Sequence, residues 1–94
     1  DVTGTHLMVA VGRRVNLDRL DLDAAGVAHD RKGVTVGANL RSTTNRRVYA
    51  VGDAAGGLMF THVAGYHAGI VVRQALFALP ARAGTSAIPR ATYT

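Results

Sequence analysis

The stretch VYAVGDAAGG, residues 48–57, decides how the rest of the chain is interpreted. Apolar residues that favour β-strands lead directly into Gly52 and Asp53, and two further glycines follow close behind. A short, continuous apolar run of this kind is typical of a buried strand. We therefore predict a strand over residues 48–52 that ends on a lone carboxylate in a glycine-rich loop.

A long helix is predicted after this loop. Residues 61–80 read THVAGYHAGIVVRQALFALP, and Pro80 would end a helix near Leu79. Apolar side chains cover most of the helical circumference and leave only a narrow polar stripe, formed by His67, Arg73 and Gln74. Such a helix is normally buried on several sides, and we expect His67 to be a satisfied structural residue. Gly65 and Gly69 share one face, which favours close packing against another backbone.

The residues before the loop predict further strands. THLMVAVG at 5–12 is typical of a buried strand, and VTVGANL at 34–40 of an exposed or edge strand. Between them, Asp18 is placed to cap a short helix that stops at Gly26. HDRKG at 29–33 has the composition of a turn. Two apolar strands and one long helix favour an α/β or α+β chain over an all-helical one.

Composition sets limits on the function. The chain has 94 residues, no cysteine, and 11 Lys and Arg against six Asp, which gives a net charge of +5. Without cysteine, disulfides, thiolate metal sites and thiol catalysis by this chain are excluded. A chain this short buries only about 60–65% of its unfolded surface, so its stability is expected to be marginal. It has no signal-peptide pattern and no long apolar run, so we expect a cytoplasmic protein without a membrane partner.

The layout around Asp53 suggests a ligand site. A strand that ends in Gly-Asp, followed by a glycine loop and a helix, is the arrangement found at the carboxyl edge of α/β sheets. Gly52 would let a ligand approach the main chain, and Asp53 can accept two hydrogen bonds from a polyol or a ribose diol. A helix that begins near Thr61 offers free N–H groups and the positive end of its dipole. The alternative is that Asp53 caps its own loop.

Four blocks of the chain carry a family resemblance. In order they are LMVAVGRRVN, GVTVGANLRSTTNRRVYAVGDAAGG, LMFTHVAGYHAGIVVRQALF and IPRATYT. With these blocks and gaps the chain resembles the C-terminal half of the flavoprotein (pyridine nucleotide-disulfide) oxidoreductases, and most of all the branch of mercuric reductase and dihydrolipoamide dehydrogenase. The resemblance covers nearly the whole chain.

The resemblance implies a parent protein with three domains. Such a parent is a homodimer that carries FAD and uses NADH or NADPH to reduce a disulfide or a metal ion. Residues 1–11 would end the NAD(P)-binding domain, and residues 12–80 would form the second segment of a Rossmann-like α/β FAD-binding domain. Residues 81–94 would be a linker and the start of the dimerisation domain. The chain would then be an incomplete piece of the fold, cut at both ends.

The resemblance also implies roles for single residues. Asp53, after Gly52, takes the place of the family's ribitol-binding aspartate. The main chain at the pyrimidine edge of the flavin would come from Met59, Phe60, Thr61 and His62. The N–H groups there would stabilise negative charge at flavin N1 and O2. Gly12 falls where the family's backbone approaches the nicotinamide nucleotide.

The chain departs from the family pattern in what it lacks. Val15 stands where the family usually has proline, which makes that loop less rigid. The chain contains no G-x-G-x-x-G, no C-x4-C redox pair and no C-terminal His-Glu pair. We therefore expect no catalytic residue and no metal site in this chain, and no activity of the chain by itself.

Three alternatives remain open at this stage. One is a basic module that binds a nucleotide or nucleic acid through Arg13, Arg14, Arg46 and Arg47. No aromatic residue is interleaved among these arginines, which disfavours that hypothesis. Another is a gene remnant that only dimerises through its apolar helix. The third concerns His62, whose side chain could lie near the flavin or simply cap the helix or meet solvent.

Overall fold

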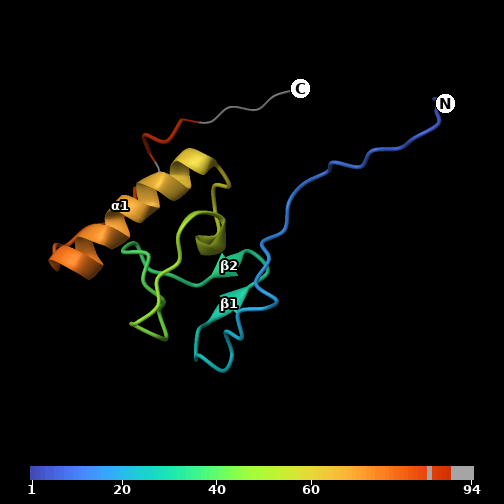
Figure 1. Cartoon of the computed structure of the whole chain (residues 1–94). Helices are drawn as coiled ribbons and strands as arrows, with labels where there is room; N and C mark the ends of the chain where they lie inside the picture. The colour runs from blue at the N-terminus through green and yellow to red at the C-terminus, as the bar shows by residue number, and fades with distance from the viewer. Residues whose placement is uncertain (85, 90–94) are drawn as a thin grey trace.

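The computed structural model describes residues 1–84 and 86–89. Its regular elements are two short strands, one turn of 3-10 helix and one long helix (Figure 1). Their bounds are β1 His29–Asp30, β2 Gly33–Val34, η1 Gly52–Ala55 and α1 Thr61–Phe77. A small sheet and one helix in this order correspond to part of an α/β fold rather than to a complete one. The predicted start of a further domain falls largely on residues 90–94, which lie outside the described residues.

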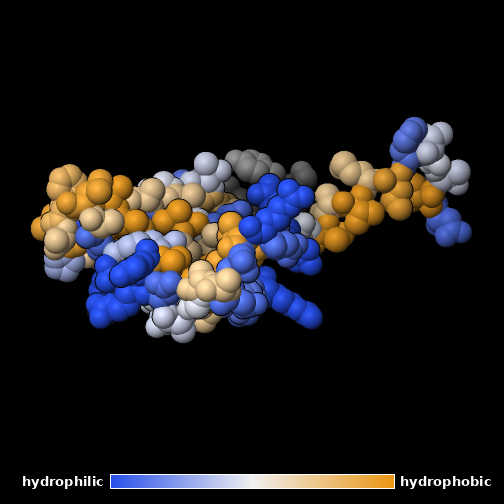
Figure 2. Space-filling view, turned by 60° about the horizontal axis from the view of Figure 1, so that its bottom comes forward, coloured by the Kyte–Doolittle hydropathy of each residue, from blue (hydrophilic) through white to orange (hydrophobic). Residues whose placement is uncertain are grey.

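The amino-terminal arm, residues 1–14, projects away from the body of the molecule (Figures 1 and 2). The strand predicted at 5–12 is wrong, because the arm is extended but has no regular structure and lies exposed along its whole length. Leu7 and Val11 expose 89% and 93% of their surface. The radius of gyration is 16.5 Å, against about 12 Å for a compact chain of this size. An apolar run becomes a strand only when a neighbour accepts and donates its backbone hydrogen bonds.

The short helix predicted from Asp18 to Gly26 is also wrong, because this segment forms a series of turns. Asp21 adopts a positive φ of 49°, which interrupts any right-handed helix there. Main-chain bonds from Ala25 to Asp21 (3.2 Å) and from Val27 to Leu22 (2.9 Å) close the turns. Gly26 has a positive φ of 66°, but it follows a turn and not the predicted helix.

Strands β1 and β2 form a tight antiparallel hairpin, as the turn composition of residues 29–33 predicts. His29 pairs with Val34, and Asp30 pairs with Gly33. The Asp30 carboxylate accepts hydrogen bonds from the N–H groups of Lys32 (2.8 Å) and Gly33 (3.3 Å). Aspartate stabilises turns in this way because its short side chain reaches the backbone two or three residues ahead.

The two remaining predicted strands are reduced to isolated bridges. The segment 34–40 contributes the end of β2 and one bridge from Val36 to Ser42, and 48–52 contributes one bridge between Arg41 and Tyr49. Leu40 has a φ of 62°, which breaks the extended conformation between these bridges. The Arg41 guanidinium donates hydrogen bonds to the Tyr49 hydroxyl, one of them over 3.0 Å from Nε, and lies 4.9 Å from the centre of its ring. This contact fixes the segment that leads into η1.

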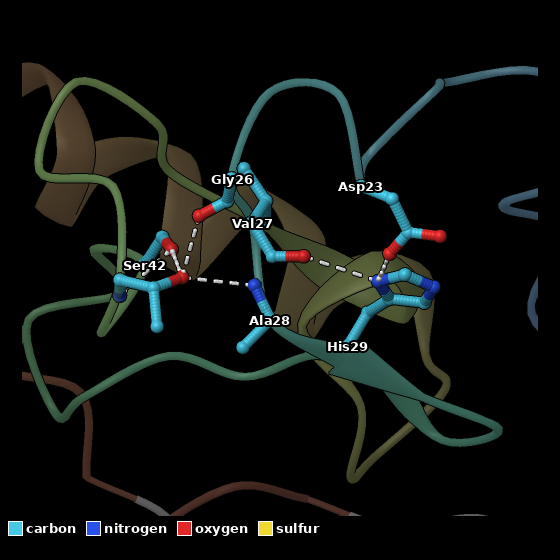
Figure 3. Close-up of polar contacts among 7 residues, drawn as sticks. Asp23, Gly26, Val27, Ala28, His29 and Ser42 are labelled. Carbon is cyan, nitrogen blue, oxygen red and sulfur yellow. Dashed lines mark hydrogen bonds and ion pairs between the residues drawn. The ribbon is translucent and has the colours of Figure 1, made fainter.

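A small core lies between the hairpin and η1. Its buried members are Val27, Val34 and Ala50, with Leu17, Leu22, Val36, Val48, Ala54 and Ala55 packed around them. The Thr44 hydroxyl ties the start of the hairpin to the neighbouring loop, because it accepts from the Ala28 N–H (2.9 Å) and donates to the Gly26 carbonyl (2.8 Å). Figure 3 shows its partners Gly26 and Ala28 together with the His29 ring, whose Nδ1 donates to the Val27 carbonyl over 3.1 Å. These bonds hold the hairpin in a fixed position.

Helix α1 confirms the predicted helix and ends two residues before the expected Leu79. Ala78 adopts the left-handed conformation that often terminates helices, and the Leu79 N–H bonds to the Arg73 carbonyl at 2.9 Å. Over the described residues, no helix has the length and apolar content needed to cross a bilayer.

A helix as apolar as α1 is normally buried on several sides, but the described part of this short chain buries it on one side only. Only Val63, His67 and Ile70 are buried, whereas apolar side chains elsewhere on the helix are exposed, among them Val72, Leu76 and Phe77. Figure 2 shows this hydrophobic surface at the carboxyl end of α1 and along the arm. Gly65 and Gly69 are exposed, and an added Cβ would meet nothing within 4 Å. The described residues cover only one face of the helix.

Candidate functional site

Asp53 sits in η1, a single turn between the bridge at Tyr49 and the start of α1. The turn is closed by its own main chain, because the Gly56 N–H donates to the Asp53 carbonyl at 3.0 Å. The Asp53 side chain is exposed, and within the described residues nothing donates a hydrogen bond to its carboxylate. The carboxylate therefore does not cap its own loop, and its oxygens are free to accept hydrogen bonds from outside the chain.

Gly52 is required by the packing of the turn against α1. It has a φ of +61°, and a Cβ there would lie 2.8 Å from the Ala64 Cβ and 3.4 Å from the Ala64 Cα. Side chains are excluded on both counts, by conformation and by contact. The packing of Gly52 against Ala64 of α1 was not predicted from the sequence.

The hairpin supports the other end of the same turn. At Gly33, a Cβ would lie 2.6 Å from the Ala54 carbonyl oxygen and 2.7 Å from the Gly56 nitrogen. At Gly56, an added Cβ would lie 3.1 Å from the Lys32 carbonyl oxygen. The backbones of hairpin and turn are thus in direct contact. Gly33 was missed as a site residue, because its place after a polar turn already accounts for a glycine there.

The first turn of α1 presents unpaired donors. The N-cap residue of α1 is Phe60, whose carbonyl accepts hydrogen bonds from the N–H groups of Val63 (3.0 Å) and Ala64 (3.3 Å). In the described part of the chain, the N–H groups of Thr61 and His62 have no such partner. The first turn carries no acidic residue and no side-chain cap. The positive end of the helix dipole is therefore uncompensated and favours an electron-rich group.

His62 makes contacts within the chain. Its ring stacks on Phe60 with centroids 5.4 Å apart, and Nε2 donates to the Pro89 carbonyl at 2.9 Å. Nearby, the Tyr66 hydroxyl accepts from the Gly84 N–H at 3.2 Å. A cavity of about 350 Å³ lies between this end of α1 and the segment that follows the helix. The His62 side chain thus anchors that segment, while Met59 and Phe60 are half-buried beside it.

His67 connects α1 to the Asp53 turn. Its Nδ1 accepts a hydrogen bond from the Gly52 N–H at 3.1 Å, and only 7% of the residue is exposed. Burial lowers the pKa of His67, because it disfavours the charged ring. The expectation of a satisfied histidine is confirmed. Its contact with Gly52 was not foreseen, because a histidine on a polar stripe gives no sign of which turn it will meet.

Gly12 and the larger cavities lie apart from this turn. Gly12 belongs to the exposed amino-terminal arm, and an added Cβ there would meet nothing within 4 Å. The cavity of about 500 Å³ is lined by residues between 14 and 31, and Asp53 lines neither this cavity nor the one beside His62. The described residues contain no group of three or more His, Asp or Glu placed to hold a metal ion. The candidate site is therefore an open surface made by η1 and the start of α1.

Comparison with known proteins identifies the family. The sequence profile described as pyridine nucleotide-disulphide oxidoreductase matches residues 2–68, which include the arm, the hairpin, η1 and the first part of α1.

The chain belongs to the pyridine nucleotide-disulphide oxidoreductase family.

Curated relatives support the same assignment. The chain is 34% identical to a mercuric reductase of Lysinibacillus sphaericus over 99% of its own length and 17% of the relative's. It is 35% identical to a dihydrolipoyl dehydrogenase of Bacillus subtilis (strain 168) over 95% of the chain and 19% of the relative. A dihydrolipoyl dehydrogenase of Chlorobaculum parvum is 37% identical over 98% of the chain and 19% of the relative. The chain thus spans less than a fifth of the length of these relatives. Members of this oxidoreductase family use FAD and a nicotinamide nucleotide.

Proposed function

We propose that this chain forms part of an FAD-dependent NAD(P)H oxidoreductase that reduces a disulfide or a metal ion. In this proposal residues 12–80 are the second segment of the FAD-binding domain, residues 1–11 end the NAD(P)-binding domain, and residues 81–94 lead into a dimerisation domain. The reacting groups lie in other parts of a homodimeric parent. This chain supplies the surface that holds the FAD ribityl chain and the pyrimidine edge of the flavin.

The observation that carries the proposal is the free carboxylate of Asp53, which projects from a turn whose backbone is packed on both sides. Nothing among the described residues donates to it, while the turn beneath it is fixed from two sides. Gly52 lies against α1, and Gly33 lies against the end of the turn. An ionised carboxylate accepts bonds from two neighbouring hydroxyl groups and itself offers no donor, which suits the hydroxyls of a ribityl chain.

The start of α1 provides the second half of the fit. Its unpaired N–H groups at Thr61 and His62 suit the carbonyl oxygen and ring nitrogen of a flavin pyrimidine edge. When bound, the flavin supplies hydride-transfer chemistry. The helix dipole favours the negative charge of the reduced form by about 0.3–1 kcal/mol, and by more where the site is shielded from water. Met59 and Phe60, half-buried before the helix, continue the same strip of main chain.

The exposed apolar surfaces are consistent with a larger parent. The outer face of α1 and the arm carry large side chains that are half or more exposed, including Leu7, Leu76 and Phe77. We propose that other segments of the parent cover these surfaces. Gly12, in the arm, would then be placed near the nicotinamide nucleotide by those segments.

The proposal is tested by FAD titration of the full-length gene product after removal of its flavin. We expect Asp53→Asn to weaken FAD binding by about 10- to 150-fold, since hydrogen bonds to a charged group contribute about 1.5–3 kcal/mol. Asp21→Asn is the matched control, because it removes an exposed carboxylate elsewhere at a positive φ that Asn tolerates. Equal FAD affinity in the two variants would remove Asp53 from the site.

A further inference from the structure

We propose that His67 is a positioning residue for the Asp53 carboxylate, and that it acts through the hydrogen bond between its Nδ1 and the Gly52 N–H. The proposal rests on the FAD site described above. It assigns a role in cofactor binding to a side chain that itself lies beneath the turn and does not face the ligand.

The geometry fixes the chemical form of the ring. A backbone N–H can only donate, so Nδ1 of His67 must accept with its lone pair over the 3.1 Å to Gly52. The ring proton is therefore on Nε2. A doubly protonated ring has no acceptor and would place two donors against each other. Only the neutral tautomer is compatible with the observed turn.

The bond controls the residue that precedes Asp53. Gly52 is buried and has a φ of +61°, and contact with Ala64 prevents it from approaching the helix more closely. Glycine without such restraints would rotate freely between several conformations. The bond from His67 selects one of them and so fixes the backbone from which the Asp53 side chain projects. His67 and Ala64 come from the same helix, so α1 sets the position of that backbone.

The surroundings of His67 contain few charges. The charged residues on the segments that pack against α1 are Asp53, in η1, and Arg41. Arg41 lies in the loop whose Asn39 carbonyl accepts a hydrogen bond from Gln74 of α1. On α1 itself, the Tyr66 ring lies 6.0 Å from the His67 ring, centre to centre. The described part of the segment after the helix, residues 78–84 and 86–89, carries one ionisable side chain, that of Arg82, which is exposed. Burial alone therefore lowers the pKa of His67.

A pH dependence follows from this environment. The folded turn requires the neutral ring, so the pKa of His67 is lower in the folded than in the unfolded chain. The hydrogen bond therefore stabilises the turn fully at any pH above the unfolded pKa. Because any state with the bond broken takes up a proton more readily, acid favours the broken state. FAD affinity should be constant at neutral and higher pH and fall as the pH drops below about 6.5, the ordinary value for histidine.

Two variants of the full-length gene product test the proposal by FAD titration between pH 5.5 and pH 8. His67→Leu keeps bulk but has no acceptor, and leaves a buried N–H unpaired; we expect a loss of affinity of about 5- to 100-fold at pH 8. His67→Asn places its amide oxygen close to the position of Nδ1 and does not titrate. We expect it to bind FAD within about threefold of wild type at pH 8 and to lack the wild-type decline below pH 6.5. His6→Asn, in the exposed arm, is the control and should behave as wild type.

The outcomes separate this inference from the proposed function. If Asp53→Asn weakens FAD binding but His67→Leu binds like wild type, His67 has no positioning role and the FAD site stands. If wild type and His67→Asn decline equally in acid, the proposal is also overturned, even should His67→Leu fail to fold. If the wild-type protein binds no FAD at pH 8, both the function and the inference are wrong. Rescue by Asn together with the flat acid profile would establish the role, because a purely space-filling histidine predicts neither.

Discussion

Replacing Gly52 by alanine tests whether the contact between the Asp53 turn and α1 holds the site together. The substitution places a Cβ 2.8 Å from the Ala64 Cβ, at a φ of +61°. A left-handed conformation costs an alanine about 1–2 kcal/mol. Forcing an extra carbon into a packed contact costs about 1–3 kcal/mol. We therefore expect Gly52→Ala to lower the free energy of unfolding by about 2–5 kcal/mol.

Gly57→Ala is the matched control. Gly57 also has a positive φ, +78°, but an added Cβ would meet nothing within 4 Å. Gly57→Ala should therefore lower the free energy of unfolding only by the cost of the left-handed conformation, about 1–2 kcal/mol. The assay is urea unfolding of the full-length gene product, followed by a probe on the FAD domain, with midpoints compared at unchanged slope. Equal midpoints for the two variants would refute the argument that helix contact makes Gly52 necessary.

Two other substitutions probe the supports of the site. Gly33→Ala should destabilise the protein by at least about 1–3 kcal/mol and weaken FAD binding, because its Cβ would overlap main-chain atoms of the Asp53 turn. Wild-type FAD affinity in this variant would show that the hairpin does not support the turn. Gln74→Leu should cost about 1–3 kcal/mol, because the Asn39 carbonyl loses the donor that now lies 2.7 Å away. Its neighbour Arg73→Leu, on the exposed side of the helix, should change the unfolding free energy by less than about 0.5 kcal/mol; a similar cost for both leucine variants would contradict the importance of this bond.

The sequence predicted the elements whose stability is local. Helix α1 was predictable because a run of helix-compatible residues ends before a proline. The hairpin turn at 29–33 was predictable because Asp30 stabilises it through its own neighbours. The place of Asp53 at the end of an extended segment and before a helix was also predictable. In each case the decisive contacts lie within a few residues along the chain.

The features that the sequence did not predict depend on contacts between residues far apart in the chain. Residues 5–12 have the composition of a buried strand, but a strand needs a neighbour, and no described residue pairs with them. The polar stripe of α1 was recognised from the sequence, but its partners were not: His67 is buried against Gly52 and Gln74 donates to the Asn39 carbonyl. A hydropathy pattern shows which side of a helix is polar, but it does not show which polar group a distant turn will need.

The most direct test of the central claim is the visible absorption spectrum, together with the intact mass, of the protein isolated from its native cells. Our account predicts a flavin absorption band in a protein several times longer than these 94 residues, as three domains of about 100–150 residues each require. A colourless species of 9.8 kDa would contradict it. In that case Asp53 and the start of α1 would not be part of a flavin site.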